Sequence, residues 1–328
     1  MNGTMGSAAR ALWYAARGRA ELRPCPLPAP GPQDALVHTA WSGISRGTER
    51  LVFEGRVPVS EASTMRAPMQ DGDFPFPVKY GYSAVGYVED GPAVLEGRPV
   101  FALHPHQDRF VAAAAALIPL PDDVPPWRAI LAANMETAVN AVWDSGAAPG
   151  ARIVVVGAGT VGLLVTYLSA RISGASVTVA DVVPERRVIA ESFGAAFVPP
   201  EDVPSDADIV FHTSATAAGL ATAVAAAGFE AKIVEMSWYG DGTVAVPLGG
   251  AFHSRRLQLI SSQVGHVAPS HRAHWSHRRR LEHALALLAD ERIDALITEN
   301  VPFADLPDML PRLLASGAPG LATAVRYS

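Results

Sequence analysis

Residues 152–181 constrain the fold of this chain more than any other part of its sequence. The segment begins with Arg152–Val156, which is mostly β-branched, as a strand buried on both faces of a parallel sheet would be. Three glycines follow with the spacing G-x-G-x-x-G, and residues 163–172 then carry an apolar helical pattern. A second apolar strand, Ser176–Ala180, ends at Asp181. This order predicts the first strand–helix–strand unit of a doubly wound α/β sheet.

Each part of this unit has a task in binding a dinucleotide. Gly157 would form the tight turn, Gly159 would let the backbone approach a pyrophosphate, and Gly162 would let the helix lie close to the strand. Thr160 and Val161 fall in the first helical turn, whose free N–H groups and partial positive charge favour phosphate. The alternative is a glycine-rich turn that binds nothing.

The acidic residue at the end of the second strand bears on cofactor choice. Asp181 would accept hydrogen bonds from the adenosine ribose and repel a 2′-phosphate, so NAD(H) is favoured over NADP(H). Arg186 and Arg187 follow and could instead attract a phosphate. We interpret Arg186 as stacking beside the adenine or lying exposed.

Composition excludes several classes of protein. A chain of 328 residues and 34.5 kDa with 49% hydrophobic residues can form two domains. A formal net charge of −6 gives no reason to expect nucleic acid or a membrane as partner, and no apolar run could cross a bilayer. The first ten residues lack a signal-peptide core, so we expect a cytoplasmic protein. The one cysteine, Cys25, excludes a cysteine-rich structural zinc site.

The rest of the chain predicts a β-rich part and an alternating α/β part. Short strands are expected before residue 120, whereas a helix at 127–143 opens a region where strands and helices alternate. We predict a catalytic domain from residues 1–124 together with 266–328, and a dinucleotide-binding domain from 125–265. Three histidines near residues 271–277 and three arginines after them are interpreted as an exposed helix start rather than a metal or phosphate site.

Nearly the whole chain resembles the medium-chain dehydrogenase/reductase superfamily, which includes zinc alcohol dehydrogenases and quinone reductases. The matching stretches are GAGTVG at 157–162, SGISRGTERLVFEG at 42–55, VKYGYSAVGYVED at 78–90, GRPVFALHPHQDRFV at 97–111 and LAANMETAVNAV at 131–142. The resemblance implies the α/β class, with a β-rich GroES-like catalytic domain, a Rossmann domain, and assembly as a homodimer. SGIS-GTER and VFALHPHQ are similar to the branch that contains bacteriochlorophyllide dehydrogenase, which oxidises a hydroxyethyl group on a tetrapyrrole.

The departures from the superfamily pattern concern the metal. Where zinc members have a cysteine before the GT pair, this chain has Ser45 or Arg46. The histidine of GHE is replaced by Tyr82, and the third ligand position by Ala133. These residues are poor zinc ligands or cannot bind zinc at all. We therefore predict a member without zinc.

Without a metal, a side chain must handle the proton that accompanies hydride transfer. By position in the family, Thr48 corresponds to a hydroxyl that relays protons, and Thr137 to a threonine near the nicotinamide. His104, at the end of a strand that lines the substrate pocket in the family, is our first acid/base candidate because its ordinary pKa is near neutral; Tyr82 is the second. Alternatively Thr48 caps a helix that begins near Glu49, Tyr82 fills space, and His104 is an exposed turn residue.

Strand ends and one arginine complete the predicted site. In open α/β sheets, ligands bind beyond the carboxyl ends of the strands. The residues expected there are His212, Thr213, Ser214, Ser237, Trp238, Tyr239 and the segment 261–263, and Arg46 is expected at the cofactor pyrophosphate. Trp238 and Tyr239 could bound a pocket for a bulky substrate or lie in a dimer interface.

These features predict a zinc-independent, NAD(H)-dependent oxidoreductase that acts on a secondary alcohol/ketone pair. A second possibility is a reductase of enone or quinone double bonds, which is common among zinc-free members of the superfamily. A possibility of another class is a nucleotide-binding sensor or scaffold without catalysis, which the loss of every zinc ligand would favour.

Overall fold

The computed structural model describes residues 9–328, which form two compact units. The first unit contains residues 9–133 and Ile297–Ser328, and the second contains Asn134–Leu296. Within these residues no helix is long and apolar enough to cross a membrane.

Two β-sheets build the first unit. The larger sheet has the order β16-β17-β3-β6-β7-β9, with β8 also paired to β3, and the smaller has the order β2-β1-β5-β4. In β3, buried and half-buried residues alternate, because one face of the strand packs on the apolar core around Val37, Phe110 and Leu117. The strands are β1 (Ala9–Ala16), β2 (Arg19–Cys25), β3 (Asp34–Ile44), β4 (Asp71–Gly72), β5 (Val78–Lys79), β6 (Ala84–Asp90), β7 (Pro99–Ala102), β8 (Arg109–Ala113), β9 (Ile118–Pro119), β16 (Ile297–Pro302) and β17 (Ala322–Arg326).

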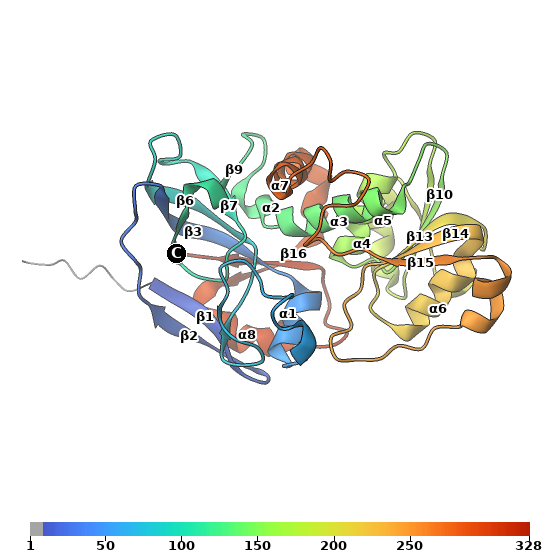
Figure 1. The fold of residues 1–328 in the computed structure, drawn as a ribbon, viewed down its shortest axis with the longest axis horizontal. Helices are drawn as coiled ribbons and strands as arrows, with labels where there is room; N and C mark the ends of the chain where they lie inside the picture. The colour runs from blue at the N-terminus through green and yellow to red at the C-terminus, as the bar shows by residue number, and fades with distance from the viewer. Residues whose placement is uncertain (1–8) are drawn as a thin grey trace, which may run out of the picture. The chain divides into compact units, whose positions relative to one another are not determined.

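Three α-helices belong to this unit: α1 (Arg46–Phe53), α2 (Pro126–Ala129) and α8 (Leu306–Leu313). Figure 1 shows α8 beside β1 and β2, and its buried leucines pack there. Ser45 is the N-cap of α1, so the helix begins earlier than predicted. Thr48 therefore lies inside the first turn and does not cap the helix.

The second unit is built on a parallel six-stranded sheet with the order β12-β11-β10-β13-β14-β15. Its central strands are buried on both faces, which explains their continuous apolar sequences. Figure 1 shows α6 on one face of this sheet and α4 and α5 on the other. The elements are β10 (Arg152–Val156), β11 (Ser176–Ala180), β12 (Ala196–Val198), β13 (Ala207–His212), β14 (Ala227–Glu235), β15 (Gln258–Ser261), α3 (Ala132–Ser145), α4 (Thr160–Ser169), α5 (Arg187–Ser192), α6 (Ala217–Ala226) and α7 (His277–Ala286).

The structure corrects three expectations. The helix expected at 127–143 is interrupted after Ala129, and α3 starts only at Ala132. Among the strands longer than two residues, β2 and β12 were not expected, and Cys25 is the last residue of β2. Residues 266–296 belong to the second unit and residues 125–133 to the first, whereas the predicted boundaries placed both segments the other way.

The contacts of Arg280 explain why the segment 266–296 belongs to the second unit. Its side chain is 1% exposed and donates to Glu136 Oε1 at 3.0 Å and to Asn140 Oδ1. It also donates to the backbone carbonyls of Val264 and His266. These bonds attach α7, the helix that carries Arg280, to α3. We expected Arg280 to lie in an exposed helix start, but its side chain is buried.

Candidate functional site

The glycine-rich turn between β10 and α4 has room for a phosphate group. A Cβ atom on Gly162 would lie 1.9 Å from the Gly157 carbonyl oxygen, and one on Gly157 (φ +106°) would lie 2.9 Å from the Ser214 nitrogen. Both positions therefore require glycine. Gly159, by contrast, faces open space and directly precedes Thr160 and Val161 in the first turn of α4. A pyrophosphate fits there against the helix N-terminus.

The Asp181 carboxylate forms hydrogen bonds with the glycine-rich turn and with two residues that follow it in the chain. Oδ2 of Asp181 accepts from the Ala158 amide and from Arg186 Nη1 at 3.0 Å, and Oδ1 accepts from the Val183 amide at 2.8 Å. The side chain is nearly buried, whereas that of Arg186 is about one quarter exposed, at 24%. Arg186 is thus paired with Asp181, in contrast to the stacking or exposed role that we expected for it.

A hydrogen-bonded array joins the ends of β13 and β14. Nδ1 of the fully buried His212 donates to Glu235 Oε2 at 2.7 Å, and His212 Nε2 accepts from the Ser214 hydroxyl at 2.7 Å. Tyr239 donates to the same Glu235 oxygen at 3.1 Å, and the Ser237 amide donates to Oε1 at 2.8 Å. Although burial acts in the opposite direction, His212 and Ser237 lower the pKa of Glu235. The array fixes two predicted cofactor residues, Ser214 and Ser237, at the carboxyl edge of the sheet.

The remaining predicted residues of this unit have varied surroundings. Thr213 Oγ1 donates to the carbonyl oxygens of Val156 (3.1 Å) and Gly157 (2.7 Å), so its hydroxyl supports the glycine turn. Trp238 follows Ser237 and is half-buried. Thr137 lies on α3 and is also half-buried.

In the first unit, the structure brings Tyr82 together with Thr48 and Ser45. The side chains of Ser45 and Thr48 are the two hydroxyl groups that act on the Tyr82 hydroxyl. Burial raises the pKa of Tyr82 to about 12, although the two hydroxyls act in the opposite direction. Tyr82 therefore keeps its proton at neutral pH and has two neighbours that would stabilise the phenolate if the proton left. We call Tyr82, Ser45 and Thr48 the hydroxyl cluster.

A network of buried side chains centred on Glu49 of α1 is bonded to Ser45 of this cluster. Glu49 Oε2 accepts from Tyr14 (2.6 Å) and His106 Nε2 (3.0 Å), and its Oε1 accepts from the Ser45 amide (2.7 Å). His106 Nδ1 in turn accepts from Ser42 at 2.7 Å. The carboxylate thereby holds the N-cap residue of α1, which also contributes its hydroxyl to the cluster. The local sequence around His106 carries no signal for this role, because its partners Glu49 and Ser42 lie far away in the chain.

His104 is buried and stacked on an aromatic ring. It is 3% exposed, and its ring stacks on Phe110 with centroids 3.8 Å apart. Its Nδ1 donates to the Pro105 carbonyl at 2.9 Å. Burial lowers the pKa of His104 to about 3. Our first candidate for acid/base chemistry is therefore a neutral imidazole at pH 7, without the second, acidic proton of an imidazolium, and the alternative of an exposed turn residue is wrong.

This pKa shift predicts how stability changes with pH. The unfolded histidine takes up a proton below about pH 6.5, whereas native His104 does not, so the free energy of unfolding should fall as the pH drops below that value. In His104→Asn, an amide can replace the Nδ1–H bond and does not titrate. Between pH 7 and pH 5 the wild type should lose about 1–2 kcal/mol more than the variant in urea unfolding. Parallel losses in the two proteins would contradict this expectation.

Two further predicted positions have structural partners. Arg46 donates to the carbonyls of Ala318 (2.6 Å), Pro319 (2.9 Å) and Gly320 (2.9 Å), so a pyrophosphate contact would require these bonds to break. Ala133 is buried in α3. Among residues 9–328, no group of three or more His, Cys, Asp or Glu side chains is arranged to hold a metal ion.

No family model matches the sequence, but solved structures share its fold. A protein from Sinorhizobium meliloti 1021 that was solved with NADP is 19% identical, with a TM-score of 0.77 over 98% of this chain and 100% of its own. An alcohol dehydrogenase from Escherichia coli CFT073 with NADH is 15% identical, with a TM-score of 0.75 over 98% and 100%. The 2R,3R-butanediol dehydrogenase of Bacillus subtilis is 17% identical, with a TM-score of 0.75 over 97% and 99%.

Proposed function

We propose that this chain, which has the fold of the medium-chain dehydrogenase/reductase superfamily, is a zinc-independent oxidoreductase for a secondary alcohol/ketone pair. The observation that carries the proposal is the hydroxyl cluster. Ser45 and Tyr82 stand at positions where the superfamily resemblance places zinc ligands, and the side chains of Ser45 and Thr48 both act on the Tyr82 hydroxyl in the direction that favours its phenolate. In this proposal Tyr82 is the proton donor, supported by Ser45 and Thr48, and it takes over the role that zinc has as the Lewis acid in the zinc-dependent members.

The nicotinamide cofactor would supply or accept the hydride at the carbinol carbon. Reduction of a ketone leaves negative charge on oxygen, which needs a proton from a neighbouring group. Tyr82 remains protonated at neutral pH because burial raises its pKa to about 12. The hydroxyls of Ser45 and Thr48 would donate to the Tyr82 oxygen as the proton leaves, and Thr48 would relay the replacement.

The cofactor-binding residues support NAD(H) as the preferred cofactor. The open backbone at Gly159 suits the pyrophosphate, and the Asp181 carboxylate at the end of β11 would repel a 2′-phosphate. Arg186 is the one cation beside that carboxylate within the described chain, and it is held by the Asp181 ion pair at 3.0 Å. We therefore expect Asp181 to keep Arg186 from serving as a phosphate ligand.

Replacing Asp181 tests this cofactor preference. Asp181→Ser should weaken NADH binding about tenfold, through the lost charged hydrogen bonds, and strengthen NADPH binding because Arg186 is released. Dissociation constants from nucleotide fluorescence give the measurement. Glu185→Gln, an exposed acid in the same connection, is the matched control and should change neither constant by more than about twofold. Unchanged discrimination in Asp181→Ser would remove Asp181 from the cofactor site.

The reaction class is tested by comparing substrates. A panel of secondary alcohols and ketones should show turnover, with little on enones and quinones, because the hydroxyl cluster serves a carbonyl oxygen rather than a carbon atom. Turnover of enones alone would favour the double-bond reductase, and binding of NADH without turnover of any substrate would favour the sensor. Zinc independence predicts unchanged rates after treatment with a chelator; loss of activity that zinc restores would refute it.

We also propose that the protein is a homodimer. The strand β15 ends the six-stranded sheet and exposes Leu259, which is 38% accessible. An exposed strand edge with an apolar side chain is a surface on which a second copy can extend the sheet. Light scattering in solution measures the mass directly, and the mass of a single chain would contradict the proposal.

A further inference from the structure

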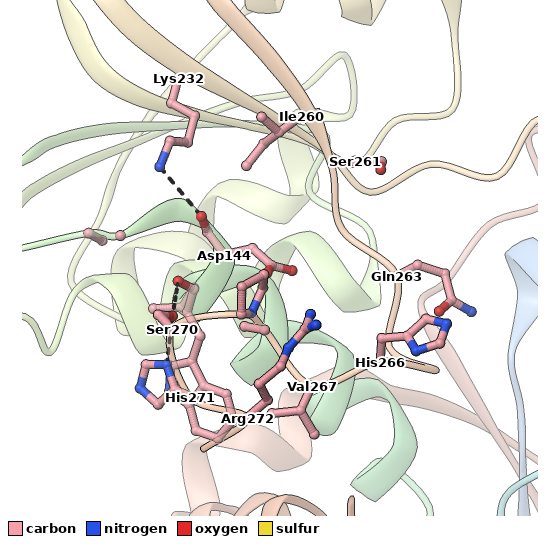
Figure 2. Close-up of a pocket in the computed structure, with 16 residues that line it drawn as sticks. Asp144, Lys232, Ile260, Ser261, Gln263, His266, Val267, Ser270, His271 and Arg272 are labelled. Carbon is pink, nitrogen blue, oxygen red and sulfur yellow. Dashed lines mark hydrogen bonds between the residues drawn. The ribbon is translucent and has the colours of Figure 1, made fainter. Parts of the chain in front are cut away.

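The second unit contains a cavity of about 830 Å³, and of the predicted site residues only the segment 261–263 contributes to its lining, through Ser261 and Gln263. It lies between the C-terminal end of α3, the strands β14 and β15, and the segment 263–272 (Figure 2). No residue of the glycine-rich turn, β10, β11 or β13 lines it. Its volume is within the range of small-molecule sites. We call it the α3–β15 cavity.

Much of the wall is apolar. The apolar lining residues come from all three sides of the cavity, and they are Val142, Ala147, Ile260, Val267, Ala268 and Pro269. Trp143 adds a ring that stacks on His271, with centroids 4.2 Å apart and planes 4° from parallel. This stacking holds the rim in place, so a ligand would meet a surface that is already formed.

Two of the charged groups in the wall are occupied by protein partners. Lys232 Nζ donates to the Ser145 carbonyl at 2.8 Å, at the end of α3. Asp144 Oδ2 accepts from Ser262 Oγ at 2.7 Å and from Asn140 Nδ2 at 3.1 Å. These bonds serve the local structure, and neither group is an obvious anchor for a ligand.

Arg272 differs from these groups. Arg272 is an exposed residue, and Figure 2 shows its side chain extending from the 263–272 segment toward the middle of the group of residues that line the cavity. No carboxylate among residues 9–328 forms an ion pair with it, whereas Arg278, which is also exposed, pairs with Glu282 at 2.8 Å. A guanidinium of this kind binds a carboxylate or phosphate through two parallel hydrogen bonds.

We propose that the α3–β15 cavity is a second small-molecule site, which binds an amphipathic anion with its carboxylate or phosphate on Arg272 and its apolar body on the cavity wall. The combination of an unpaired guanidinium and an apolar wall selects for both parts of the ligand. An uncharged molecule of the same length lacks the ionic contact, and a small anion lacks the apolar contact.

Trp143 provides a local probe of binding. The chain has six tryptophans, so a protein labelled with ¹⁵N-tryptophan gives six indole signals, and Trp143→Phe identifies the one from the cavity. Octanoate and octyl phosphate are added to the full chain in saturating NADH, which keeps the cofactor edge filled. Both should shift the Trp143 signal at millimolar concentration. Octanol and acetate should shift it at least about tenfold less effectively.

Arg272→Gln and Arg278→Gln form a matched pair. Both remove one positive charge from the same region, but only Arg272 lines the cavity. The apparent affinity for octanoate should fall about tenfold or more in Arg272→Gln and should stay within about twofold in Arg278→Gln. Ala147→Phe, which fills part of the cavity, should weaken both octanoate and octyl phosphate. An unmoved Trp143 signal, or equal affinities in the two arginine variants, would overturn the proposal.

Discussion

Replacing Tyr82 by phenylalanine should lower the rate of ketone reduction by about two to four orders of magnitude. The change removes the hydroxyl on which the side chains of Ser45 and Thr48 both act. Because the nucleotide edge lies in the other unit, the dissociation constant of NADH should stay within about twofold. Single-turnover reduction of a good ketone substrate and a separate NADH titration give the two numbers.

Tyr80→Phe is the matched control for this experiment. Tyr80 is 2% exposed, and its ring contacts that of Tyr82 edge-on, with centroids 6.0 Å apart. Burial raises the pKa of Tyr80 as well, but the hydroxyls of Ser45 and Thr48 act on Tyr82. Tyr80→Phe should therefore keep most of the activity. Full turnover in Tyr82→Phe, or equal losses in the two variants, would exclude Tyr82 as the proton donor.

Replacing Arg280 by methionine should destabilise the protein by about 3–5 kcal/mol, because it leaves the Glu136 carboxylate buried without its partner. The substitution also leaves Asn140 and two backbone carbonyls without a donor. Burial raises the pKa of Glu136 even with Arg280 present. Without Arg280 this pKa should rise further, so the deficit should shrink at low pH, where Glu136 takes up a proton, and grow as the pH rises. Urea unfolding at pH 5 and pH 8 measures the change.

Two comparisons make this prediction specific. Arg278→Met, two residues earlier in α7, breaks an exposed pair with Glu282 and should cost less than about 1 kcal/mol. The double variant Arg280→Met with Glu136→Leu should recover much of the loss, since it removes the buried charge together with its partner. A double variant as unstable as Arg280→Met alone would show that the lost carbonyl contacts, rather than the uncompensated carboxylate, dominate.

Several parts of the candidate site could be predicted because they depend on local sequence. Arg152–Val156 and Ser176–Ala180 form strands with the expected bounds, since a run of β-branched residues between turn signals has few other stable conformations. Gly157 and Gly162 stand where a Cβ atom would collide with backbone. The interrupted helix near Ala129 was missed because its apolar spacing continues across the break.

The sequence alone could not decide between His104 and Tyr82 as the acid/base residue. His104 was preferred over Tyr82 because an ordinary histidine titrates near neutrality. In the fold His104 stacks on Phe110 and its pKa falls to about 3, whereas Tyr82 gains two hydroxyl neighbours. Burial and partners decide a pKa, and neither can be read from residue type.

The sequence by itself determined the alternation of strands and helices in the parallel sheet, the position of its glycine-rich turn and the residues at the expected metal positions. These follow from patterns that repeat over a few residues. Only the tertiary structure decided which polar groups meet. His106 lies 57 residues from Glu49, and Arg280 lies 144 residues from Glu136, yet both pairs are buried and bonded. A buried polar group is stable only with a partner, and that partner is chosen by how the chain packs rather than by its neighbours in sequence.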